Sequence, residues 1–237
     1  MTELNNNSPM PLYTQLEKIL TELIENGTYP QGSRFPTEEE LSNQFHVSRV
    51  TVRKALQPLA EKGILERKAR KGTYVAQKKL TRTLTNVISF SEMCKAQGLK
   101  PGARTLRIDL VTPSREDSEL LQLKPESQLL LLERLRYADE RPITIERLKF
   151  PESFFFLMEE DLTNTSLYDI LSKHHIYPMA SSKELDIVAA SYKESKYLNI
   201  AKNHPLLRII SLVKTADHLP LHLSEQLCNM DRFKFYV

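Results

Sequence analysis

Cysteine, tryptophan and long apolar runs are what this chain of 237 residues has least of. Tryptophan is absent, and the only cysteines are Cys94 and Cys228. Two cysteines so far apart lack the spacing of a zinc site and give no disulfide framework, so we expect a protein of a reducing compartment. No apolar stretch approaches the ~20 residues that span a bilayer. Residues 1–10 lack the basic-then-apolar pattern of a signal peptide. We therefore expect a cytoplasmic protein that does not enter the membrane.

A large excess of one charge is also missing, because 33 basic residues face 30 acidic ones. The distribution along the chain is nevertheless uneven. Residues 1–48 contain two basic and seven acidic residues, residues 49–79 contain ten and two, and residues 80–237 contain 21 of each. A basic segment confined to so short a stretch is typical of a surface that contacts a nucleic-acid phosphate backbone.

Residues 36–57 have the pattern of a helix-turn-helix. Thr37 and Glu40 have the spacing of a capping box, in which the two side chains satisfy backbone N–H groups at the start of a helix. A short turn follows that helix, and the hydroxyl of Ser48 can cap a second one.

The second helix presents two chemically different faces. Its apolar stripe recurs at helical spacing and consists of Val52, Ala55, Leu56 and Leu59. The opposite face carries Arg49, Val50, Arg53, Lys54 and Gln57. Such a helix fits the DNA major groove, where an arginine can bind guanine through two hydrogen bonds and a lysine can contact a phosphate. An ordinary core helix with a solvated basic face is the alternative.

Two short strands are predicted after this helix, at residues 64–68 and 73–77, with a turn at residues 69–72. Another helix is predicted at residues 11–26, where Leu and Ile recur at helical spacing. A helix, a helix-turn-helix and a basic hairpin in this order predict a winged helix-turn-helix domain over residues 1–76.

Residues 11–76 resemble the GntR family of bacterial regulators. The resemblance is carried by PLYTQLEKIL, FPTEEELSNQF, VSRVTVRKAL and EKGILERKARKGTYV and by the spacing between them. It implies that the domain binds a double-stranded DNA operator, with Arg49 and Arg53 reading bases and the wing reaching the minor groove. On this basis the expected DNA contacts are Thr37, Ser48, Arg49, Thr51, Arg53, Lys54, Arg70, Lys71 and Gly72.

Two positions depart from the family pattern. Glu39 stands where many members have a third DNA-contacting arginine, so we expect no DNA contact from it. Arg70 replaces the first glycine of the wing tip and leaves only Gly72. An arginine at this tip suits a narrow minor groove, where negative potential is concentrated. A phosphate contact is the alternative for Arg70.

The rest of the chain mixes helical and strand periodicities. We expect residues 77–88 to form a polar linker and residues 89–237 to form an α+β domain with a largely antiparallel sheet. The predicted strands lie near residues 104–111, 128–150 (a hairpin), 183–190, 206–216 and 219–228, and we expect residues 233–237 to close the sheet. The predicted helices lie at residues 89–99, directly after Pro113, at residues 166–176 and at residues 191–199.

The hairpin at residues 128–150 is the clearest candidate for a ligand site. Arg134 and Arg136 lie two residues apart in a strand, so their side chains project from the same face. Glu146 lies on the returning strand. Two arginines and a carboxylate could hold an anionic ligand that also bears hydroxyl or amino groups. Cross-strand ion pairs on a solvated face are the alternative.

Residues 86–237 resemble the UTRA effector domain of the HutC-like branch of the same family, whose fold is similar to that of chorismate lyase. The matching segments are FSE, LERLRYADERPITIE, EDLTNTSLYDIL and HLPLHLSEQ. The resemblance implies an effector such as a phosphorylated sugar or amino sugar, held by Phe90, Ser91, Arg134, Arg136, Glu146, Ser166, Tyr168 and Glu225. Cys228 stands where some sugar-phosphate regulators have a tyrosine, which leaves the identity of the sugar open.

These observations predict a homodimeric, ligand-responsive transcription regulator, most simply a repressor of a palindromic operator, with no cofactor or metal. Three alternatives stay open at this point. The second domain could be a chorismate-lyase-like enzyme for a small anionic substrate, although no catalytic motif is visible. It could sense a non-phosphorylated carboxylate. The whole protein could also be an architectural DNA protein, which its large neutral second half disfavours.

Overall fold

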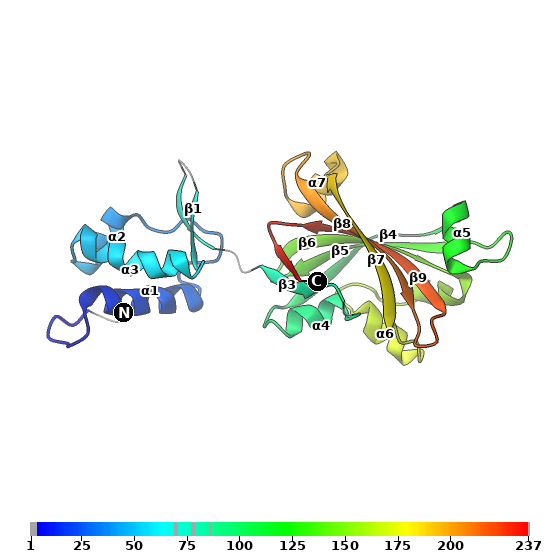
Figure 1. Ribbon diagram of the computed structural model, residues 1–237, viewed down its shortest axis with the longest axis horizontal. Helices are drawn as coiled ribbons and strands as arrows, with labels where there is room; N and C mark the ends of the chain where they lie inside the picture. Colours follow the sequence, from blue (N-terminus) through cyan, green and yellow to red (C-terminus); the bar gives the residue numbers. More distant parts are fainter. Residues whose placement is uncertain (1–3, 69–70, 77–78, 86, 237) are drawn as a thin grey trace. The chain divides into compact units, whose positions relative to one another are not determined.

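The computed structural model describes residues 4–68, 71–76, 79–85 and 87–236. The chain divides into two compact units, Met1–Lys78 and Lys79–Val237, which we describe separately (Figure 1). Within the described ranges, no helix has the length and apolar character that a membrane crossing requires.

The first unit is a winged helix-turn-helix, as predicted. Its elements are α1 (Leu12–Glu25), α2 (Glu38–Phe45), α3 (Arg49–Glu61), β1 (Leu65–Lys68) and β2 (Gly72–Val75). The apolar stripes of α1 and α3 meet in one core, where Leu16, Leu20 and Leu59 are fully buried. Pro58 does not end α3, which continues to Glu61.

Side-chain caps determine where the two central helices begin. The hydroxyl of Thr37 accepts from the Glu40 backbone N–H at 3.2 Å, and the Glu40 carboxylate accepts from the Thr37 N–H at 2.6 Å. His46 adopts a left-handed conformation with φ of 53° that ends α2. Ser48 then accepts from the Thr51 N–H at 3.1 Å and starts α3. The capping box and the second cap expected from the sequence are both present.

The second unit is built on a six-stranded sheet in the order β4-β5-β6-β9-β8-β7, in which all neighbouring strands are antiparallel. Its strands are β4 (Pro101–Val111), β5 (Leu129–Ala138), β6 (Arg141–Phe150), β7 (Ala180–Ala189), β8 (Pro205–Lys214) and β9 (Pro220–Asn229). Its helices are α4 (Phe90–Lys95), α5 (Arg115–Leu121), the 3₁₀ helix η1 (Glu152–Met158), α6 (Leu167–Lys173) and α7 (Tyr192–Leu198). The fold is therefore α+β with a mainly antiparallel sheet.

The prediction that the C-terminal segment closes this sheet is wrong. β10 (Phe233–Tyr236) instead pairs in parallel with β3 (Leu80–Thr83) as a separate two-stranded sheet. Leu80 and Phe233 are opposite each other and buried against α4, which explains why these strands pair. β3 lies within residues 77–88, which we expected to be a linker.

Helices cover both faces of the six-stranded sheet. Figure 1 shows α4 and α6 on one side and α7 on the other, and the buried clusters agree with this arrangement. α6 and η1 pack on Leu130, Leu132 and Leu148, whereas α7 packs on Leu135 and Ile145. The leucine run at residues 129–132 therefore belongs to the core. We call the side covered by α4 and α6 the α4/α6 face.

The β3–β10 pair provides a stability test. Phe233→Ala removes a ring that is 4% exposed, so we expect it to lower the free energy of unfolding by about 3–5 kcal/mol. Tyr236→Ala, at a ring that is 46% exposed on the same strand, should cost less than about 1 kcal/mol. Denaturant titration followed by far-ultraviolet circular dichroism measures both. Equal losses would contradict the assignment of Phe233 to this core.

Candidate functional site

The recognition helix α3 exposes the residues predicted to read DNA. Val52, Ala55, Leu56 and Leu59 are buried, whereas Arg49, Arg53 and Lys54 are exposed. Val50 beside them is an apolar side chain that is 62% exposed. Ser48 and Thr51 bond to each other through their hydroxyls at 2.9 Å, so both serve the start of the helix.

Carboxylates of α2 hold the two arginines of α3. Arg53 donates to Glu38 through Nε and Nη2, the latter at 2.9 Å, and this contact lowers the pKa of the Glu38 carboxyl. Arg49 pairs with Glu39 at 2.6 Å. Glu39 therefore pairs with one of the two arginines predicted to read bases, which is a role that the sequence did not indicate. Both pairs are at least partly open to solvent, where an ion pair contributes little to stability.

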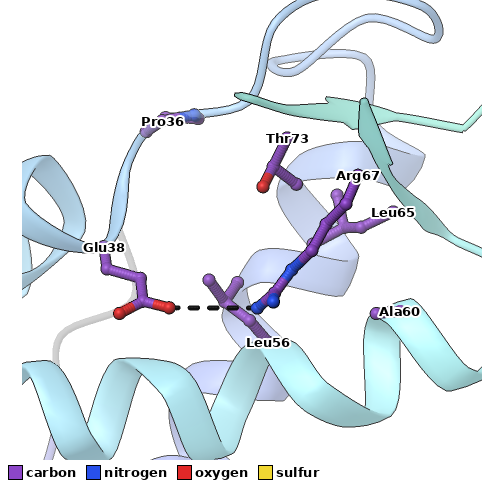
Figure 2. Close-up of a pocket in the computed structure, with 7 residues that line it drawn as sticks. All are labelled: Pro36, Glu38, Leu56, Ala60, Leu65, Arg67 and Thr73. Atoms are coloured by element: carbon purple, nitrogen blue, oxygen red, sulfur yellow. Dashed lines mark ion pairs between the residues drawn. The ribbon is translucent and has the colours of Figure 1, made fainter. Parts of the chain in front are cut away.

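The wing adds cations on the same side of the unit. Figure 2 shows Glu38 facing Arg67 of β1 across a shallow hollow, with the two charged groups 3.9 Å apart. Lys71 is exposed at the turn. Gly72 has a φ of 100°, and a Cβ there would lie 3.6 Å from Arg34 Nε. The predicted contact of Arg70 lies outside the described residues.

The candidate ligand residues of the hairpin are buried together. Arg134, Arg136 and Glu146 are 0%, 3% and 6% exposed, and all three lie on the α4/α6 face. Arg134 is directly opposite Glu146 across β5 and β6. The alternative of ion pairs on a solvated face is therefore wrong. A buried charge is costly unless it is paired, so this cluster requires an explanation.

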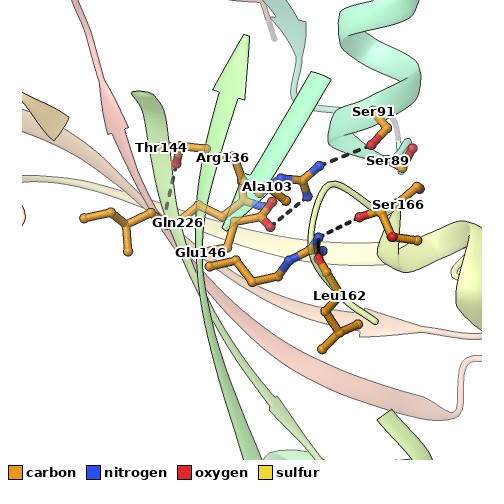
Figure 3. A network of polar contacts seen from close by, with 12 residues as sticks. Ser89, Ser91, Ala103, Arg136, Thr144, Glu146, Leu162, Ser166 and Gln226 are labelled. Atoms are coloured by element: carbon orange, nitrogen blue, oxygen red, sulfur yellow. Dashed lines mark hydrogen bonds and ion pairs between the residues drawn. The ribbon is translucent and has the colours of Figure 1, made fainter. Parts of the chain in front are cut away.

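Arg136 is fully engaged within the protein. It donates to Glu146 Oε2 at 3.1 Å and to Ser91 Oγ at 3.2 Å, between which Figure 3 shows its guanidinium. Its Nε donates to the Gly102 carbonyl at 3.4 Å. The guanidinium also lies over the Phe90 ring, 4.5 Å from the ring centre. Arg136 thus connects the sheet to the first turn of α4.

Arg134 is only partly satisfied. Its Nη2 donates to the carbonyls of Leu162 and Thr165 at 2.9 and 2.6 Å, in the loop before α6. Its Nε and Nη1 are buried without a hydrogen-bond partner in the described part of the chain. Burial, followed by repulsion from Arg136, lowers the pKa of Arg134 to about 10. Arg134 therefore remains charged at neutral pH, and its Nε and Nη1 are donors without an acceptor, although Arg134 is not among the residues that line the neighbouring pocket.

A pocket opens on the α4/α6 face beside this cluster. Its empty volume is about 370 Å³, part of it open to solvent, and its lining includes Phe90, Arg136, Glu146, Leu148, Tyr168, His222, Ser224 and Gln226. Ser91 reaches it through Arg136. Ser166 is buried and caps α6 by accepting from the Asp169 N–H at 3.3 Å. Burial raises the pKa of the Tyr168 phenol, so that group stays protonated.

Glu225, which we expected in this site, lies on the opposite face of the sheet. It accepts from Arg147 Nη1 at 2.8 Å, and Arg147 also binds Glu133 and Glu194. The reason is the strand register, because Glu225 is opposite Arg147 whereas Gln226 is opposite Glu146. The β9 residues that face the pocket are therefore the even-numbered ones, including His222, Ser224 and Gln226.

Sequence reasoning also missed Arg82. This residue of β3 donates to the side chain of Gln226, and its charge helps to lower the pKa of Glu146. Its strand lay in the segment expected to be a linker. The short apolar-polar alternation of Leu80–Thr83 was the one available signal.

The two cysteine thiols near the pocket are in their protonated, unreactive form. Burial raises the pKa of Cys94 to about 12 and also raises the pKa of Cys228, so both thiols stay protonated at neutral pH. Among the described residues, no three His, Cys, Asp or Glu side chains are grouped so that they could hold a metal ion. The polar groups that line the pocket can bind a ligand through hydrogen bonds and ion pairs.

Known proteins resemble the chain over both units. Residues 12–75 match the family described as "Bacterial regulatory proteins, gntR family", and residues 96–234 match the UTRA domain. "Uncharacterized HTH-type transcriptional regulator YurK" of Bacillus subtilis strain 168 is 36% identical over 236 residues, covering 99% of this chain and 98% of that protein. "Probable fructoselysine utilization operon transcriptional repressor" of Escherichia coli strain K12 is 30% identical over 239 residues, covering 100% and 98%.

A solved structure agrees in fold. PhnF from Mycobacterium smegmatis superimposes with a TM-score of 0.73 at 26% sequence identity, covering 94% of this chain and 96% of that one. Together, the recognition helix, the pocket and these relatives establish what the chain is. It belongs to the GntR family of bacterial regulatory proteins, carries a UTRA domain and is a ligand-responsive, DNA-binding regulator of transcription.

Proposed function

We propose that the chain is a homodimeric repressor whose affinity for its operator changes when an anionic sugar derivative binds the pocket on the α4/α6 face. A phosphorylated sugar or amino sugar fits this site best. The fructoselysine-related repressor named above supports a sugar-derived effector. The observation that carries the proposal is the unbalanced charge at Arg134.

The buried cluster carries a net positive charge in the unliganded protein. Arg134 and Arg136 are opposed by one carboxylate, Glu146, and that carboxylate is bonded to Arg136. The lowered pKa of Arg134 means that folding disfavours its charged form, so the charge destabilises the folded protein at every pH below about 10. An anion that accepts from Nε and Nη1 would remove this penalty. Phosphate is favoured because it offers several acceptor oxygens to a guanidinium fork.

The same contacts suggest how the ligand acts on DNA binding. Arg134 holds the loop at residues 162–165, and Arg136 holds the first turn of α4 through Ser91. An anion bound beside both arginines also competes with Ser91 for Arg136 Nη2, so its binding repositions α4. α4 begins seven residues after β3 in sequence, and β3 begins directly after the DNA-binding unit. A difference in ligand affinity between two arrangements of these elements suffices for a switch.

Two copies of the recognition helix would read the two halves of a palindromic operator. In each copy, Arg49 and Arg53 must exchange Glu39 and Glu38 for base edges. We place the contact between protomers in the second unit. There the edge strand β7 exposes Leu185 and Ile187, which are 45% and 63% exposed and point to the α4/α6 face.

The assignment of α3 and the wing to DNA binding predicts different effects for substitutions at a base contact and at a phosphate contact. Arg53→Ala should lose about 1–3 kcal/mol of discrimination between operator and unrelated DNA, because it removes a base contact. Lys71→Ala should weaken binding to both DNAs and reduce the slope of affinity against salt by ~1. Anisotropy titrations with an operator selected from random duplexes measure both effects. Lys62→Ala, a lysine paired with Glu17, is the charge-matched control.

The assignment of α3 would be refuted if Arg53→Ala kept the full preference of the parent protein for the selected operator. It would also be refuted if Lys62→Ala lost as much preference as Arg53→Ala.

The ligand assignment predicts that inorganic phosphate binds and stabilises the protein through Arg134. A ligand that binds only the folded state adds about 2.7 kcal/mol to the free energy of unfolding at a hundredfold excess over Kd, and it raises the midpoint temperature of thermal unfolding accordingly. Arg134→Ala should abolish this gain and the response to sugar phosphates, yet leave operator affinity nearly unchanged. Arg115→Ala, on a side chain that is 93% exposed, is the control and should behave as the parent.

An unchanged phosphate shift in Arg134→Ala would move the anion site elsewhere. A stronger shift with acetate than with phosphate would favour a carboxylate effector. Chemical conversion of a bound sugar phosphate by the purified protein would favour the enzyme alternative.

A further inference from the structure

His222 is a buried polar side chain of the pocket that the anion site does not use. It lies on β9, is 1% exposed and lines the pocket with Ser224 and Gln226. Gln226 is opposite Glu146 and Ser224 is opposite Leu148, so His222 is the next residue along the same face. His222 lies four residues from Gln226 along β9, which corresponds to ~13 Å. It is therefore at the end of the pocket away from the arginines.

The hydrogen bond at one ring nitrogen fixes the state of the other. His222 Nδ1 lies 3.3 Å from the Leu223 carbonyl oxygen, and a carbonyl oxygen only accepts, so Nδ1 carries the proton. Burial lowers the pKa of His222 to about 4, so the ring is neutral at physiological pH. Nε2 is therefore a bare acceptor, and it has no hydrogen-bond partner among the described residues.

Packing holds this acceptor in one orientation. The His222 ring lies against Phe150, with ring centres 4.7 Å apart and planes at 39°. Turning the ring would also break the bond to the Leu223 carbonyl. A buried acceptor without a donor is costly, and the cost disappears when a ligand supplies one. No donor among the described residues reaches Nε2, whereas a ligand in the pocket that His222 lines can supply one.

We propose that His222 Nε2 accepts a hydrogen bond from a hydroxyl or ammonium group of the effector, an inference that rests on the anion site proposed above. The pocket then recognises two chemical groups of one effector molecule. The arginines take the anionic group, and His222 takes a donor on the body of the sugar. A small anion without such a donor contacts the arginines but makes no hydrogen bond to His222. His222 therefore determines specificity among anionic ligands.

Calorimetry on the full chain tests this with inorganic phosphate and with a panel of hexose and aminohexose phosphates. For the tightest binder, analogues that lack one hydroxyl or amino group each are compared. In the parent protein, loss of the group that faces His222 should weaken binding about tenfold, the upper range for one neutral hydrogen bond. In His222→Phe, the intact sugar phosphate and that analogue should bind equally, while affinity for inorganic phosphate is unchanged.

Two further variants keep the test decisive. His222→Leu replaces the aromatic variant if that variant does not fold, and His222→Gln keeps an acceptor and should restore part of the discrimination. His174→Phe, at an exposed histidine outside the pocket, should behave as the parent protein.

The inference is overturned if every deletion costs His222→Phe as much as it costs the parent protein. It is also overturned if no sugar phosphate binds the parent more tightly than inorganic phosphate. Failure of inorganic phosphate to bind the parent protein would instead contradict the anion site on which the inference rests.

Discussion

The unbalanced burial of two arginines against one carboxylate is the constraint on which the account of this protein depends. Arg134 and Arg136 are buried side by side on β5, and only Arg136 has Glu146 as its ion-pair partner. Two nitrogens of Arg134, Nε and Nη1, have no acceptor in the described chain. Replacement by apolar residues would often cost little or even stabilise such a site. The presence of both charges therefore supports the proposed anion site more than a role in stability.

The partners of the two arginines connect this charge to the rest of the molecule. Arg136 holds α4 through Ser91, and Arg134 holds the loop before α6. Arg82 of β3 reaches the same pocket through Gln226. Of these segments, β3 and α4 are the first elements after the DNA-binding unit in sequence. In that unit, Glu38 and Glu39 pair with the two arginines that we propose read DNA bases.

Local signals in the sequence predicted much of this, and long-range pairing accounts for what they missed. The caps at Thr37 and Ser48 and the hairpin at residues 128–150 are encoded by neighbouring residues. The face of Glu225 depends on how β9 pairs with β6, and a shift of one residue moves a side chain to the other face. The β3–β10 pair joins residues from opposite ends of the unit, which no periodicity reveals. The burial of Arg134 likewise depends on α4 and α6.

The central claim concerns individual N–H groups of one arginine, and NMR of guanidinium N–H resonances observes them directly. The Arg134 signal can be assigned in isotope-labelled protein by its loss in Arg134→Lys. On titration with inorganic phosphate, the account predicts that the Arg134 Nε–H resonance shifts and saturates with the same affinity as thermal stabilisation, while exposed Arg115 does not respond. Saturable phosphate binding that leaves the Arg134 resonance unmoved would contradict the account.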